Sequence, residues 1–179
     1  MSGIGHFAAG FVAKPSAPKI PLWIFLVAAE TNDLLYFVFS SAGLEPKAVT
    51  SMNFSEGVRY LTPVSNPWSH GLFMSAVWAI VALALAFLFT RERRSSLLLG
   101  LVVFSHWLLD FLMHANLPLF FAGSPLLGLG LENTGPGFLF ITILDLVIIT
   151  GGIAFYIHSR KANSQNAVKE SRPQTRKTQ

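Results

Sequence analysis

Ionisable side chains lie inside several of the longest apolar stretches of this sequence. His106, Asp110 and His114 follow one another at intervals of four residues, and Glu30 precedes Asp33 by three. Helical residues at these spacings lie on one face, so each group forms a row if its segment is a helix. An imidazole and a carboxylate in the same row can bind one cation together. Imidazole and carboxylate ligands suit zinc, manganese or iron, and the absence of cysteine excludes a thiolate site.

The composition predicts that these residues lie within a membrane. Apolar residues make up 52% of the 179 residues and charged residues only 12%, about half the charged share of a soluble domain. A helix needs roughly 20 apolar residues to cross a bilayer, and four runs are long enough. The expected fold is therefore all-α: a polytopic membrane helical bundle of residues 1–157, with spans at about 20–40, 68–90, 97–121 and 138–157.

Charged groups at bilayer depth are costly, at least about 2.5–3.5 kcal/mol each. Asp33, His70, His106 and Asp110 occur at compatible depths in three predicted spans, which favours a functional site over a structural polar network. Asp145 alone fits a structural residue bonded across helices as well as a site residue. His114, near a span end, fits a structural or peripheral role.

A short apolar segment, Gly3 to Ala13, precedes the first span and is too short to cross a bilayer. It fits either a re-entrant half-helix or a helix lying on the membrane surface. In the first case His6 lies roughly 10 Å deep, near the level of Glu30 and His106. In the second case His6 cannot be a ligand.

The basic residues predict the orientation. They precede the first span, follow the second and fill the tail, and only Lys47 and Arg59 lie on the other side. By the positive-inside rule both termini are cytoplasmic, and loops 41–67 and 122–137 face outward. Residues 158–179 are basic, with almost nothing to bury, and predict a disordered tail. Its charges fit the anionic surface of a membrane, and without aromatic residues for stacking it does not indicate nucleic-acid binding.

Four short motifs contain these residues in order along the chain: Gly5-His6-Phe7, Asn32-Asp33-Leu34-Leu35, Trp68-Ser69-His70-Gly71 and Ser105-His106-Trp107-Leu108-Leu109-Asp110. Together they resemble a bacterial integral-membrane family known as membrane-bound metal-dependent hydrolases. The resemblance covers nearly the whole chain apart from the tail. It departs from the family at Thr31, which replaces the first Asp of an Asp-x-Asp motif, and at Val64–Pro67, where the family has a His-Arg-Gly segment.

The resemblance implies a hydrolase of the inner membrane with a divalent metal, zinc first and manganese or iron as alternatives, acting on a lipid or lipid-linked substrate. Its metal ligands would be His6, Asp33, His70, His106 and Asp110, and its catalytic carboxylates Glu30, Asp33 and Asp110, with Glu30 accepting a proton from water. The alternative is a proton- or ion-handling membrane protein that uses the same residues and forms a homo-oligomer. Haem ligation by His70 with another histidine is a third hypothesis, which the neighbouring carboxylates oppose.

Overall fold

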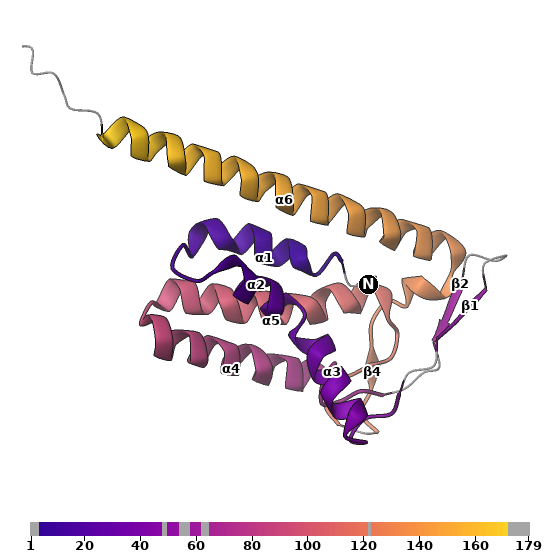
Figure 1. Ribbon diagram of the computed structural model, residues 1–179. Coiled ribbons are helices and arrows are strands. Elements are labelled where there is room, and N and C mark those ends of the chain that lie inside the picture. Colours follow the sequence, from indigo (N-terminus) through magenta and orange to yellow (C-terminus); the bar gives the residue numbers. More distant parts are fainter. Residues whose placement is uncertain (1–3, 48–49, 54–57, 62–64, 122, 172–179) are drawn as a thin grey trace, which may run out of the picture.

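The computed structural model describes residues 4–47, 50–53, 58–61, 65–121 and 123–171. This part of the chain is mostly helical, as expected (Figure 1). Its helices are α1 (Phe7–Ala13), α2 (Leu22–Ala29), α3 (Thr31–Ser41), α4 (Leu72–Thr90), α5 (Arg93–Met113) and α6 (Gly135–Ser171), with 3-10 turns η1 (Lys14–Ser16) and η2 (Leu131–Asn133). Two short antiparallel hairpins complete it, β1 (Thr50–Asn53) with β2 (Val58–Leu61) and β3 (Leu117–Pro118) with β4 (Leu126–Leu127).

Three of these helices are long and apolar enough to cross a membrane: α4, α5 and residues Gly135–Asn166 of α6. Helices α2 and α3 pass the same test only as a pair, because they meet at an angle of 56°. The described chain therefore has three candidate spans, or four if the bent pair counts as one.

The break between α2 and α3 divides the first predicted span, 20–40, at Glu30, whose φ of −102° and ψ of 11° depart from helical values. In a continuous helix the Ala29 carbonyl would accept a hydrogen bond from the N–H of Asp33. Here it accepts one from Nδ1 of His106 on α5, at 2.7 Å. Irregular backbone at membrane depth is tolerated where the protein itself satisfies it, and the partner in this case is a predicted metal ligand.

The third predicted span, 97–121, is wrong at its end, because α5 stops at Met113 and begins earlier, at Arg93. The apolar segment beyond it forms β3 with Pro118. Proline has no N–H for a helix and disfavours helical backbone in the residue before it. The helix therefore ends while the sequence is still apolar.

The predicted disordered tail, 158–179, also needs correction, because α6 continues as a helix to Ser171. Residues 172–179 lie outside the described part of the chain. From Ile153 to Ser171 the sequence contains no glycine or proline, and its alanine, glutamine and lysine residues favour helix. A helix already begun in the membrane has no signal to stop there.

The short helix α1 lies inside the protein, between α6 and the pair α2 and α5 (Figure 1). Small residues make this possible, since Ala8, Gly10 and Ala13 are buried along it. A Cβ at Gly152 of α6 would come within 3.1 Å of the backbone of Ala8, so the two helices approach this closely only because glycine stands at that position. The burial of α1 carries His6 into the interior, where it is 1% exposed.

The bundle has two distinct ends, which we call the basic end and the site end. The basic end holds η1, the α4–α5 turn and the later part of α6; there Lys19 Nζ lies 2.6 Å from Glu92 Oε1. At the site end lie the C-terminus of α5, α3 and both hairpins (Figure 1). The start of α1 lies toward the site end, whereas α6 finishes beyond the basic end. That both termini are cytoplasmic stays a prediction, because residues 1–3 and 172–179 lie outside the described part of the chain.

Candidate metal centre

The five predicted metal ligands meet near the C-terminal end of α5. His106 and Asp110 share one face of α5, as their spacing predicts, and Asp33 lies in the first turn of α3. His70 comes from the turn just before α4, and His6 from the residue just before α1. Two groups of described residues have ligand atoms close enough to share a cation, namely His6, His106 and Asp110, and Asp33, His70 and His106. These buried His and Asp side chains could hold a metal ion.

Four nitrogen–oxygen distances between the candidate ligands are close to those expected around one zinc ion. Oδ1 of Asp33 lies 3.2 Å from Nε2 of His70 and 3.6 Å from Nε2 of His106. Oδ2 of Asp110 lies 3.5 Å from the His70 nitrogen and 3.3 Å from the His106 nitrogen. Zinc bonds of about 2.1 Å in a tetrahedron place neighbouring ligand atoms about 3.4 Å apart. The contact between His70 and Asp33 also has the geometry of a hydrogen bond, although charge-assisted hydrogen bonds are usually shorter, about 2.7–2.9 Å.

The other oxygen of Asp110 faces a second pair of imidazoles. Its Oδ1 lies 3.4 Å from Nε2 of His6 and 3.7 Å from Nε2 of His114. The His6 and His106 rings stack, with centroids 3.7 Å apart and an interplanar angle of 7°. The sequence favoured a structural or peripheral role for His114; in the structure it lies at the same carboxylate as the predicted ligands.

The hydrogen bonds of His106 fix which of its nitrogens faces the carboxylates. Because a carbonyl oxygen can only accept, Nδ1 of His106 donates its proton to Ala29. In a neutral imidazole, Nε2 then carries a lone pair, and this nitrogen points at Asp33 and Asp110. It is buried and has no hydrogen-bond partner among the described residues. This is the tautomer and the orientation that a metal ligand requires.

A hydrogen-bond chain through two side chains, Ser69 and Glu45, sets the orientation and tautomer of His70 in the same way. The Ser69 hydroxyl donates to Oε2 of Glu45 at 2.7 Å, so it accepts from Nδ1 of His70 at 2.8 Å. Glu45 is 3% exposed, and its other oxygen accepts the backbone N–H groups of Trp68 and Ser69. Such outer partners orient metal-binding histidines. Sequence reasoning missed Glu45, because it lies in a polar loop, 25 residues before His70.

Glu132 accepts a hydrogen bond from His114 and so orients its ring. Its Oε1 lies 2.6 Å from Nδ1 of His114, and the residue is 2% exposed. Backbone bonds from Leu129 N to Phe111 O and from Gly130 N to His114 O hold this loop on the end of α5. The only signal of Glu132 in the sequence was its position as the single acid in a loop rich in Gly and Leu.

The predicted carboxylates differ in exposure. Asp110 is buried, whereas the side chain of Asp33 is 48% exposed, so the centre opens on the side of α3. Glu30 lies at the α2–α3 break, close enough to interact electrostatically with Asp33, His106 and Asp110. Asp145 is buried on α6 and belongs to neither group of candidate metal ligands.

Comparisons with known proteins do not identify the chain. No protein-family model, curated protein or solved structure matches it. The functional argument therefore depends on the geometry above.

Proposed function

We propose that this protein is a membrane-embedded, metal-dependent hydrolase of the bacterial inner membrane that acts on a lipid or lipid-linked substrate. The observation that supports it most is the spacing of four atoms: Oδ1 of Asp33, Nε2 of His70, Nε2 of His106 and Oδ2 of Asp110. The four nitrogen–oxygen distances among them, 3.2–3.6 Å, surround the value of about 3.4 Å expected around tetrahedral zinc. Manganese or iron would accept the same ligand types.

The two oxygens of Asp110 face different imidazoles. Its Oδ2 lies near His70 and His106, and its Oδ1 lies near His6 and His114. Catalytic zinc sites keep one position free for water or substrate, and the exposed carboxylate of Asp33 marks the side from which either would reach the centre.

A divalent cation bound there would supply an acidified water and polarise the bond to be cleaved. The chain itself then has to orient the ligands and accept a proton. The backbone carbonyl of Ala29 and the Ser69 and Glu132 side chains orient three imidazoles. Glu30, whose Oε1 is buried without a hydrogen-bond partner among the described residues, is the proton acceptor.

The surroundings of Asp33 indicate the substrate class. Phe37, one turn further along α3, is 71% exposed, and its neighbours Leu34 and Val38 are also exposed. Large exposed apolar surface marks contact with a partner or a membrane. A substrate with a lipid tail would reach the open centre along this face of α3. A lipid-linked phosphoester or amide fits this route.

Metal content tests the proposal directly. The protein purified in detergent should contain about one or more equivalents of zinc, manganese or iron by elemental mass spectrometry, and the double variant H106Q/D110N should contain none. S105A, next to His106 but bonded only to the Val102 carbonyl, is the matched control and should keep its metal. Metal-free wild-type protein after reconstitution with all three ions would refute the metal centre.

The second candidate function is a proton relay, since buried chains of Asp, Glu and His also conduct protons. A relay needs its groups spread along the membrane normal, whereas these imidazoles and carboxylates gather around Asp110. Proton flux into liposomes that persists after chelation would favour the relay. Hydrolysis of a lipid-linked phosphoester that chelation and D110N both abolish would favour the enzyme.

A further inference from the structure

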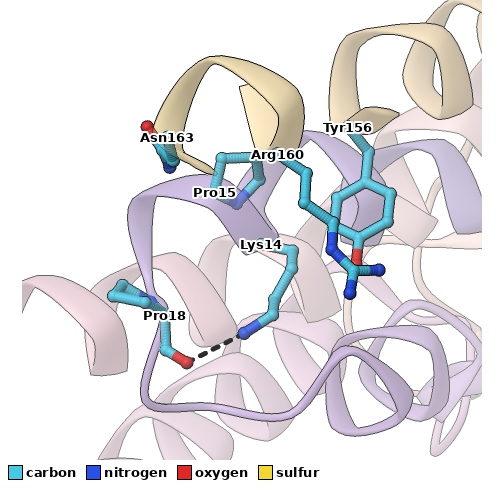
Figure 2. Close-up of a pocket in the computed structure, with 6 residues that line it drawn as sticks. All are labelled: Lys14, Pro15, Pro18, Tyr156, Arg160 and Asn163. Carbon is cyan, nitrogen blue, oxygen red and sulfur yellow. Dashed lines mark hydrogen bonds between the residues drawn. The ribbon is translucent and has the colours of Figure 1, made fainter. Parts of the chain in front are cut away.

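A cationic pocket lies at the basic end, at the opposite end of α1 from His6. It has a volume of about 170 Å³ and lies between η1 and α6. Figure 2 shows Tyr156 and Arg160 extending from α6 toward the segment that carries Lys14. The described residues that line the pocket are Lys14, Pro15, Pro18, Tyr156, Arg160 and Asn163, and none of these is acidic.

The two cations of the pocket are poised to bind an anion. Lys14 Nζ donates to the carbonyls of Pro18 (2.9 Å) and Ile20 (2.8 Å), which fixes the ammonium group and leaves its third proton free. Arg160 makes no hydrogen bond or ion pair with any other described residue. Its guanidinium has five N–H donors in a planar fork suited to phosphate. An anion between them would neutralise both charges and use these donors.

The level of the pocket along α6 identifies the kind of anion. Tyr156 lies 21 residues after the start of α6 at Gly135, or roughly 32 Å at the helical rise of 1.5 Å per residue. A bilayer's hydrocarbon core is about 30 Å thick. The pocket therefore lies where the hydrocarbon ends and the lipid headgroups begin, a level that tyrosine also favours.

Apolar surface continues from the pocket toward the bilayer centre. Phe11 packs against the ring of Tyr156 with centroids 5.9 Å apart, and Val12 and Phe155 are each about half exposed. Acyl chains can lie along this surface while a headgroup occupies the pocket. The cavity volume of about 170 Å³ is many times the roughly 10–15 Å³ that holds one water on this measure, which leaves room for a phosphate group.

We propose that this pocket binds the phosphate group of an anionic membrane phospholipid in the leaflet at the basic end, with Lys14 and Arg160 as its cationic ligands. The site is separate from the metal centre and does not depend on hydrolysis.

Native mass spectrometry of the full chain titrated with dioleoylphosphatidylglycerol tests the site. R160Q should weaken binding by at least about tenfold, because it removes charge-assisted hydrogen bonds to the phosphate. K161Q removes the same charge from the next, exposed residue of α6. It should weaken binding by no more than about fivefold, the general effect of one basic residue near an anionic surface. Both variants should keep the wild-type metal content and unfolding temperature.

Equal losses in R160Q and K161Q would overturn the proposal, because they would show only a diffuse surface charge. A second titration with inorganic phosphate at matched ionic strength distinguishes the sources of the anion. Phosphate binding that R160Q abolishes, without any preference for phosphatidylglycerol over phosphatidylcholine, would overturn the assignment to a lipid. A preference for phosphatidylglycerol that R160Q removes would support it.

Discussion

The substitution S69A provides a sharp test of the metal centre because it removes no ligand. Ser69 is fully buried, accepts from Nδ1 of His70 at 2.8 Å and donates to Glu45 at 2.7 Å. Loss of the hydroxyl leaves a buried carboxylate oxygen without this donor and frees His70 to adopt the other tautomer. Removal of such an outer partner typically lowers metal affinity 10–100-fold, or about 1.4–2.7 kcal/mol at 1.36 kcal/mol per tenfold change.

The affinity can be measured by competition for zinc between the detergent-purified protein and a chromophoric chelator. S105A is the control, since it removes a hydroxyl of the same kind beside His106 that bonds only to a backbone carbonyl. S69A should lose affinity while S105A keeps it. Equal zinc affinities in wild type and S69A would refute the view that the hydrogen-bond chain of Glu45 and Ser69 orients a metal-bound imidazole.

Three further outcomes are expected. E132Q weakens the hold on His114, so it should lower metal content or activity while leaving the Asp33–His70–His106 group able to bind; a variant indistinguishable from wild type would exclude His114 from the centre. Chelation should lower the unfolding temperature, and added zinc should restore it, because a ligand at 100 times its Kd stabilises by about 2.7 kcal/mol; D110N should show no response. The hydrogen bond from Lys19 lowers the pKa of Glu92 below its ordinary value of 4.5, so this ion pair stabilises the fold above that pH and is lost as the pH falls through the lowered pKa. E92Q should therefore lower the unfolding temperature at pH 7 but match wild type in strong acid, and a difference that grows on acidification would contradict this sign.

The sequence predicted those parts of the centre that depend on local geometry. His106 and Asp110 share a face because a helix places residues four apart on one side. The cost of placing Asp33 and His70 in apolar segments singled them out, and the structure brings both of them close to His106. Whether His6 could join them depended on how α1 packs, and its spacing alone left that question open.

The residues that sequence reasoning missed all depend on tertiary packing. Glu45 and Glu132 come from loops and meet His70 and His114 only after the chain folds. The break at Glu30 was missed because hydropathy averages over a whole span and one acid hardly changes the average. The end of α5 was missed for the opposite reason, since the apolar character continues past the point where Pro118 prevents a helix.

The break between α2 and α3 has a mechanical consequence for the centre. His106 is tied to α2 through the carbonyl of Ala29, whereas Asp33 is carried by α3, on the other side of the 56° bend. Asp33 is also the more exposed of the two carboxylate ligands. The candidate ligands therefore come from both sides of the bend, and a change of tilt in α3 alone would lengthen or shorten the distance between Asp33 and His106. Membrane helices can respond to bilayer thickness by tilting, so the spacing of a metal's ligands here would be sensitive to that thickness.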